Sequence, residues 1–168
     1  MADDGVASAV LTCAQLGRGL LADLLARYGL RLESLAPGEP IPGSFWGVPE
    51  AGLIGNRLLV RGDTPVHSAL HEACHYVCMD DRRRLGLHTD AGGGYDEENA
   101  VCYLQILLAD MLPGVGGDRL LADMDAWGYS FRLGSARAWF EDDAADARVW
   151  LLGHGLIDAA GRPTWRLR

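Results

Sequence analysis

The sequence lacks a long hydrophobic run. Its longest apolar stretch is well short of the roughly 20 residues that a membrane-spanning helix requires. The first residues, Met1-Ala2-Asp3-Asp4, are acidic, whereas a secretory signal peptide begins with a basic segment. We therefore expect a cytoplasmic protein without a membrane partner.

Positive charge is also scarce. The 168 residues include 15 Lys and Arg against 23 Asp and Glu, which gives a formal net charge of −8. An acidic chain repels phosphate backbones, so we expect no nucleic-acid partner. No internal repeat is evident. Because 49% of the residues are hydrophobic, the chain can bury one globular core, and we expect a single domain over residues 1–168.

Cysteine is limited to four residues, and none forms a C-x-x-C pair. Cys13, Cys74, Cys78 and Cys102 are too few and too scattered for a disulfide scaffold. Without a C-x-x-C pair, a structural zinc knuckle is not supported either. We expect four reduced thiols that fill small sites in the core.

The most informative segment is the pentapeptide His71-Glu72-Ala73-Cys74-His75, which has the pattern H-E-x-x-H. On a helix, residues four apart lie on one face, so the two imidazoles can bind one metal ion. Glu72 is placed beside them to accept a proton from a metal-bound water. This combination is the working part of a zinc hydrolase.

The flanking residues predict a helix of roughly 15–20 residues around this motif. Thr64-Pro65 is a suitable start, because Thr caps helices and Pro is tolerated at the first helical position. Val66, Leu70 and Val77 follow a helical period. The basic segment at residues 82–84 and Gly86 suit a helix end. The alternative is an ordinary amphipathic helix that carries two surface histidines and no metal.

A third metal ligand is expected from the segment at residues 95–108, which predicts a second helix after the run Gly92-Gly93-Gly94. An apolar stripe on this helix, extended back by one turn, reaches Glu97. A carboxylate on a buried stripe is costly unless it binds something, so we favour Glu97. Glu98 points about 100° away and is the second choice. Both acids also suit the first turn of a helix without any metal.

Three other residues compete for the third-ligand position. His67 lies one turn before His71, but ligands on three consecutive turns are too widely spaced for one tetrahedral ion. Asp81 falls where metzincins place their third ligand, yet Cys78 occupies the position of the glycine that their pattern requires. His88 lies in the loop between the two helices and is a weaker option.

The motif and the second helix together resemble the gluzincin metallopeptidases, and most closely the compact ImmA/IrrE-type bacterial group. In that group a short hairpin leads into the H-E-x-x-H helix, and a second helix follows with a pattern like E-x-x-A-N-x-F-A-x-x-L-L. The matching positions here are Glu97, Ala100, Tyr103 and Leu107-Leu108. Val101 stands where the family has a polar residue.

The resemblance covers roughly residues 45–113 and implies an α+β fold. We expect a mostly helical, minimal zincin-like domain with a small β-sheet or hairpin before the motif helix. Residues 45–113 would form the metal-binding core, and residues 114–168 a helical extension packed on it.

These features predict a zinc-dependent metallopeptidase that acts on a peptide or protein substrate. His71, His75 and Glu97 would hold Zn²⁺, and Glu72 would act as general base. Two other hypotheses stay open. One is a catalytically inactive regulatory or protein-interaction domain that keeps the zincin fold and its zinc. The other, weaker one is a metal-free helical scaffold.

A zinc peptidase usually gains from a further donor to the tetrahedral oxyanion. The candidates are Tyr95, Tyr103, His88 and His154, and the sequence does not choose among them.

The remainder of the chain gives coarser predictions. We expect a helix at residues 6–28, extended segments at 45–48 and 52–54, a strand at 56–61, and short helices at 118–127, 135–141 and 143–153. The outer edge of the 56–61 strand would pair with an extended peptide. Residues 156–167 would form a hairpin, which after a helix suggests a winged-helix shape. The aromatic residues after residue 126 would build a satellite core, with a ligand-binding wall as the alternative: Trp127, Tyr129, Phe131, Trp139, Phe140 and Trp150.

Overall fold

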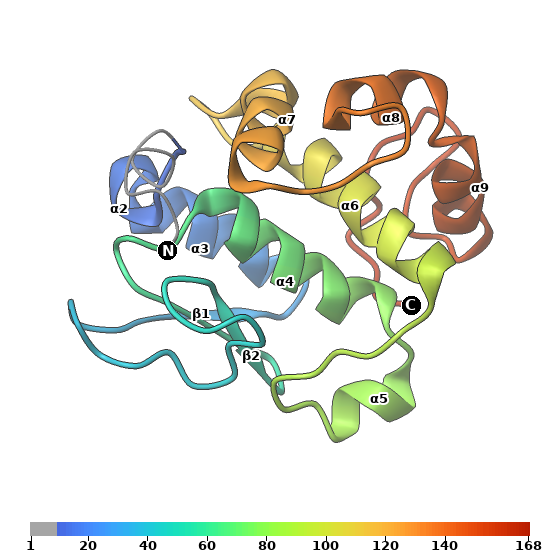
Figure 1. The fold of residues 1–168 in the computed structure, drawn as a ribbon. Coiled ribbons are helices and arrows are strands. Elements are labelled where there is room, and N and C mark those ends of the chain that lie inside the picture. The colour runs from blue at the N-terminus through green and yellow to red at the C-terminus, as the bar shows by residue number, and fades with distance from the viewer. Residues whose placement is uncertain (1–9) are drawn as a thin grey trace.

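The computed structural model describes residues 10–168 as an α+β fold, as predicted (Figure 1). In chain order the elements are α2 (Cys13–Leu16), α3 (Arg18–Ala26), β1 (Arg31–Ser34), β2 (Gly52–Ile54), β3 (Arg57–Val60), α4 (Val66–Cys78), α5 (Asp81–Leu85), α6 (Tyr95–Ala109), α7 (Gly116–Trp127), α8 (Ala136–Asp142) and α9 (Ala145–Gly153). Helices dominate, and the strands form one small mixed sheet.

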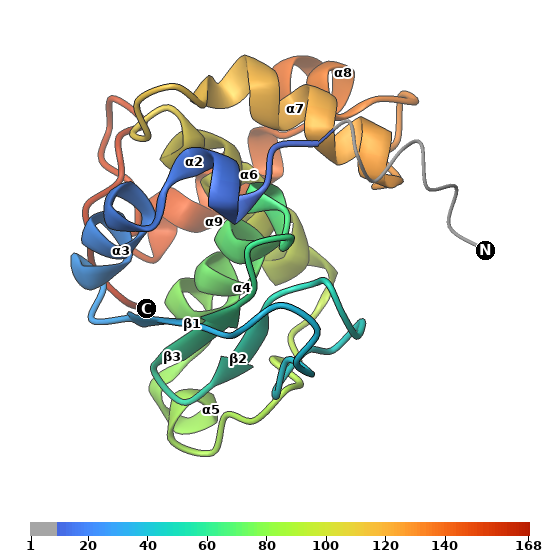
Figure 2. The same ribbon diagram turned by 90° about the vertical axis from the view of Figure 1, so that its left-hand side faces the viewer.

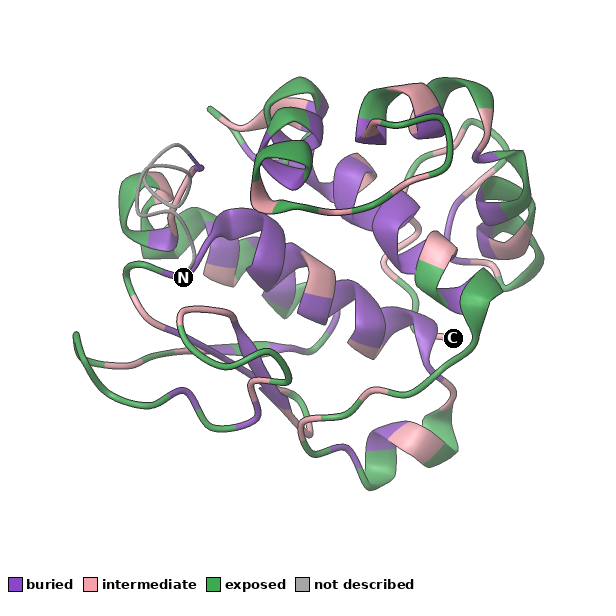
Figure 3. Ribbon diagram, in the orientation of Figure 1, coloured by how far each residue is buried: buried purple, intermediate pink, exposed green. Residues whose placement is uncertain are grey.

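Two helices, α4 and α6, form the centre of the molecule. Figure 2 shows the sheet on one side of α4, with α6 and α7 on the other. Both central helices are buried along most of their length (Figure 3). Their apolar residues belong to one core cluster that also takes in α3, the sheet and the C-terminal helices. The motif residues are therefore carried by a helix that is fixed from several sides.

The sheet has the strand order β1-β3-β2, with β3 parallel to β1 and antiparallel to β2. The predictions of extended structure at residues 52–54 and of a strand at 56–61 are confirmed. Residues 45–48 are turns and bends instead of an extended segment. The sequence reasoning missed β1, which is short and has one buried residue, Leu32.

The prediction that the 56–61 strand offers an outer edge to a peptide is wrong. β3 is the central strand, and both of its edges are already paired. The far edge of β2 is also covered, because Leu53 N–H donates to the Gly43 carbonyl (3.1 Å) and Thr89 N–H donates to the Leu53 carbonyl (3.0 Å). A Cβ atom on Gly52 would lie 2.0 Å from the Pro42 carbonyl oxygen, so only glycine permits this close crossing.

The predicted motif helix is shorter than expected and is followed by a second one. α4 ends at Cys78, and Met79 is extended. Asp80 then caps α5 by accepting a hydrogen bond from Arg83 N–H (2.9 Å). The start also differs, because Pro65 is the N-cap of α4 and the Thr64 hydroxyl accepts instead from Arg61 N–H (2.9 Å). The basic residues therefore belong to α5 and not to the motif helix.

The predicted helix at residues 6–28 is two helices, within the part of the chain that the structure describes. Gly17 separates α2 from α3 with a φ of 89°, a conformation that glycine adopts without strain. Residues 6–9 of that prediction lie outside the described range.

The three C-terminal helices lie close to their predicted positions, as α7, α8 and α9. The terminal hairpin is reduced to a single bridge between Ile157 and Pro163, and residues 156–168 contain no extended strand, so no wing forms. Trp139 is buried between Phe131 and Tyr103, as expected for a satellite core. Among residues 10–168, no helix combines the length and apolarity that a membrane crossing requires.

Candidate metal centre

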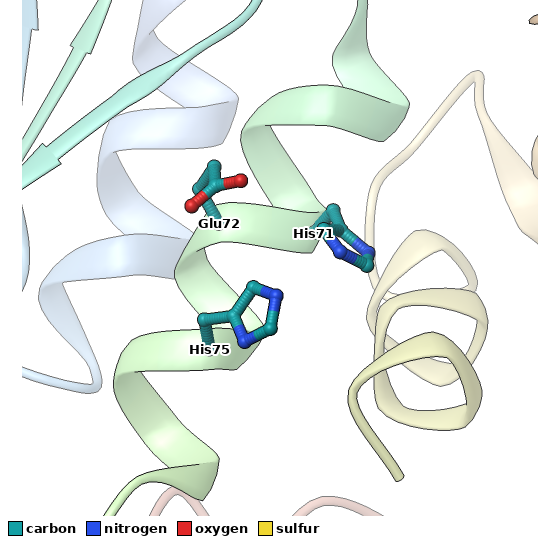
Figure 4. A group of neighbouring side chains, drawn as sticks. All are labelled: His71, Glu72 and His75. Atoms are coloured by element: carbon teal, nitrogen blue, oxygen red, sulfur yellow. The ribbon is translucent and has the colours of Figure 1, made fainter. Parts of the chain in front are cut away.

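The motif residues meet on one stretch of α4, as Figure 4 shows. The possible ligand atoms of His71, Glu72 and His75 all lie within 4.8 Å of one another. The two imidazole rings lie one helical turn apart, with their centroids 4.7 Å from each other. All three residues are buried or nearly so, which makes this group chemically suited to hold a metal ion.

Glu98 of α6 faces the two histidines. One of its carboxylate oxygens lies 3.0 Å from His71 Nε2, and the other lies 3.2 Å from His75 Nε2. Burial raises the pKa of Glu98, but the hydrogen bonds to the two imidazoles outweigh it and hold that pKa far below the usual range. The carboxylate that joins the motif is therefore that of Glu98.

Glu97, the favoured third ligand, is not at this site. Its side chain is buried, as the stripe predicted, but it accepts hydrogen bonds from Arg83 Nη1 (2.9 Å) and Arg168 Nη1 (2.8 Å). The loop before α6 closes over it, since a Cβ on Gly93 would lie 2.1 Å from its Oε2. The cost of burying the Glu97 carboxylate is offset by two guanidinium groups instead of a metal.

Asp81, His88 and His67 do not join the motif residues either. Asp81 is exposed and pairs with Arg84 (2.5 Å). Nδ1 of His88 lies 2.7 Å from the Thr89 hydroxyl. His67 is buried, its Nδ1 lies 3.1 Å from the hydroxyl of a tyrosine, Tyr129, and its Nε2 has no partner among the described residues.

Gln105 fixes the orientation of His71. The Gln105 side-chain amide N–H donates to the His67 carbonyl (3.2 Å), so its Oε1 faces His71 Nδ1 at 2.6 Å. Since Oε1 can only accept, Nδ1 carries a proton, and a metal ion at Nε2 would replace only the proton that Nε2 donates to Glu98. The sequence reasoning missed Gln105, although a polar residue in the middle of an apolar helix was a usable signal.

Glu72 is 6% exposed and makes no hydrogen bond or ion pair with any described residue. Burial raises its pKa, against the lowering effect of His71 and His75. A buried carboxylate without a partner is costly in a structural role. The environment of Glu72 instead suits a carboxylate that exchanges a proton with a molecule in the adjoining space.

That space is an open cavity of about 510 Å³. His71, Glu72, His75 and Glu98 form one wall. Aromatic residues form much of the rest: Phe45, Trp46, Trp127 and Tyr129. Trp127 and Tyr129, which the sequence analysis assigned mainly to packing, thus contribute to a wall that a ligand can reach.

None of the four predicted oxyanion donors lines this cavity. Tyr103 stacks on Phe140 (4.7 Å between centroids), and His154 lies against Trp150. Tyr95 and His88 lie outside the lining as well. The tyrosine that does line it is Tyr129, whose ring centroid lies 5.8 Å from that of His71. Nothing in the sequence pattern set Tyr129 apart from the neighbouring aromatics.

The four cysteines are free and buried, as predicted. Burial raises the pKa of the Cys13 thiol to about 12, and it also raises that of Cys74 and Cys78. Cys102, one turn after Glu98 on α6, is near enough to form a second possible ligand group with His71 and Glu98.

Comparison of this chain with protein-family models, with curated proteins and with solved structures gave no match. Function must therefore be inferred from the site itself.

Proposed function

We propose that this protein is a zinc-dependent metallopeptidase in which His71, His75 and Glu98 hold the ion. The convergence of Glu98 with both Nε2 atoms, at the wall of an open cavity, carries this proposal. Zinc ligands 2.0–2.1 Å from a tetrahedral ion lie about 3.3 Å apart. The Glu98 oxygens lie 3.0 and 3.2 Å from the two Nε2 atoms, which is close to that value, so His71, His75 and Glu98 are suitably spaced for the ion.

Zinc in this position would supply a Lewis acid that lowers the pKa of a water molecule and polarises a peptide carbonyl. Glu72 accepts a proton from the water and returns it to the leaving amine. Its burial and its lack of a fixed partner leave its carboxylate free to exchange protons in this role. The Gln105 amide keeps His71 in the tautomer that presents Nε2.

Tyr129 is the best-placed donor for a developing oxyanion. It lines the same cavity as Glu72, and its ring lies next to that of His71. Its hydroxyl lies 3.1 Å from His67 Nδ1. Such a donor stabilises negative charge on the reacting carbonyl oxygen.

The proposal is tested by incubating a peptide library with the zinc-loaded protein and identifying cleavage products by mass spectrometry. We expect cleavage that stops when zinc is removed by chelation and returns when zinc is added back. A zinc-loaded protein that cleaves no member of a diverse library would argue against a peptidase.

One observation favours a second candidate, a zinc-binding regulatory domain without turnover. The far edge of β2 is covered by Gly43 and Thr89, so a peptide cannot add to the sheet there. Binding of one equivalent of zinc together with an absence of cleavage would favour this candidate over the peptidase.

A further inference from the structure

The cavity beside the candidate metal centre is acidic. Its lining includes the carboxylates of Glu50, Glu72, Asp90 and Glu98, and no Arg or Lys among the described residues lines it. A bound divalent ion would offset two of these four charges. Since Glu98 and Glu72 are taken up by the proposed metal chemistry, Glu50 and Asp90 are left to act on whatever else enters.

Glu50 is held in a defined place. Its backbone N–H donates to the Gly47 carbonyl (3.0 Å), and the N–H of the next residue, Ala51, donates to the Ser68 hydroxyl on α4 (3.0 Å). Its Oε1 accepts from the Trp127 indole N–H (2.7 Å). These contacts connect Glu50 to the motif helix and to α7, on either side of the cavity.

No described cation pairs with the Glu50 carboxylate. Most other partly buried carboxylates among the described residues have an arginine, as Glu33 has Arg57 and Asp143 has Arg132. Glu50 has only a neutral indole donor. Its second oxygen is thus available to a positively charged group inside the cavity.

The aromatic lining favours the same kind of ligand. Trp46 is 72% exposed and Phe45 is 53% exposed, and their rings meet edge to face with centroids 5.1 Å apart. Both line the cavity, with Trp127 beside Glu50. Tryptophan faces attract ammonium and guanidinium groups, most strongly where water is partly excluded. A carboxylate next to such faces is a typical environment for an organic cation.

We propose that this cavity selects peptides that carry a cationic group near the bond to be cleaved, with Glu50 binding the cation and Trp46 and Trp127 flanking it. This inference rests on the proposed peptidase function and names its substrate class. The cation is either the guanidinium or ammonium of a basic side chain or the free α-ammonium of the peptide.

The test measures binding separately from cleavage. The zinc-loaded Glu72→Gln variant is titrated by calorimetry with three probe peptides of five residues. The first is acetylated and has a central arginine among alanines. The second is identical but has citrulline, which is neutral and of nearly the same shape. The third has the citrulline sequence with a free amino terminus. The first and third peptides distinguish the two sources of the cation.

We expect at least one cationic peptide to bind about 10-fold more tightly than the acetylated citrulline peptide, the size of one charge-assisted hydrogen bond. Adding Glu50→Gln, which keeps an acceptor for the Trp127 indole, should reduce this preference to less than about 2-fold. The matched control Asp142→Asn removes an exposed carboxylate on α8, outside the cavity lining, and should leave the preference intact.

Equal binding of all three peptides, no binding of any of them, or a preference that survives Glu50→Gln would each overturn the inference. These results are independent of turnover. If the cationic peptides bind selectively but the parent protein cleaves nothing, the peptidase proposal fails and the cation preference stands.

Discussion

Glu97 and Glu98 are consecutive residues of α6, yet their carboxylates contact different partners. Glu98 lies within 3.2 Å of the imidazole nitrogens of His71 and His75, whereas Glu97 accepts hydrogen bonds from Arg83 and Arg168. One carboxylate is thereby available to a metal ion, and the other is used to hold the fold together.

This division predicts different effects for two similar substitutions. Glu98→Ala should weaken zinc binding by 10-fold or more, because it removes a proposed ligand. Glu97→Gln should leave zinc affinity within about 2-fold but reduce the free energy of unfolding by about 1–3 kcal/mol, since two guanidinium groups lose their shared carboxylate. Zinc titration and urea unfolding measure both. A loss of zinc affinity in Glu97→Gln with none in Glu98→Ala would reverse the assignment.

Gln105 should act on zinc through His71. Gln105→Leu leaves His71 Nδ1–H without its acceptor and is expected to weaken zinc binding about 10- to 100-fold. Gln105→Glu retains an acceptor oxygen and should recover most of that affinity. Competition with a chelator of known strength measures the change. Equal zinc affinity in Gln105→Leu and the parent protein would show that the imidazole needs no such support.

Tyr129 should contribute to turnover but not to metal binding. Tyr129→Phe is expected to lower kcat about 100-fold with zinc content unchanged, as for loss of one oxyanion donor. Tyr103→Phe is a matched control, because Tyr103 packs against Phe140 outside the cavity. Steady-state kinetics on a peptide found in the library screen provide the readout. Comparable kcat values for the two variants would remove Tyr129 from the mechanism.

His67 should make stability depend on pH. Burial, with a smaller effect of His71, lowers the pKa of His67 from 6.5 to about 3. The folded protein therefore keeps His67 neutral, and the unfolded chain binds the additional proton between pH 6.5 and 3. Stability from this group is fully present above pH 6.5 and is lost as the pH falls toward 3.

At pH 4.5 the expected loss from His67 is about 2.5 kcal/mol relative to pH 7, since each pKa unit corresponds to 1.36 kcal/mol. His67→Gln removes the titrating group and should flatten this part of the curve. Urea unfolding of both proteins at the two pH values gives the comparison. If the two proteins lose equal stability on acidification, His67 is not the source.

Much of the fold was predictable because it follows from local patterns. The H-E-x-x-H helix, the strands at residues 52–54 and 57–60 and the second helix at 95–109 lie where the sequence pattern predicts them. The end of α4 was not predicted. Asp80 can either continue the helix or cap a new one, and the residue type alone does not decide between these conformations.

Glu97, the predicted third ligand, lies away from the motif histidines, because burial alone does not reveal which partner a carboxylate has. Periodicity correctly marked Glu97 as buried, but its partners Arg83 and Arg168 are 14 and 71 residues away in sequence. Likewise, Tyr129 lies 62 residues from His67, and Glu50 lies 77 residues from Trp127. Contacts at such separations follow from the packing of whole elements, which a single sequence does not reveal.

The substitution Glu72→Gln tests the central claim most directly. It keeps the size of the side chain and the three proposed ligands, and it removes only the group that accepts a proton. The parent protein and the variant are compared for zinc content and for the rate of hydrolysis of one cleaved peptide. We predict equal zinc content and a rate at least about 100-fold lower in the variant. A variant that carries zinc and cleaves as fast as the parent protein would contradict the account.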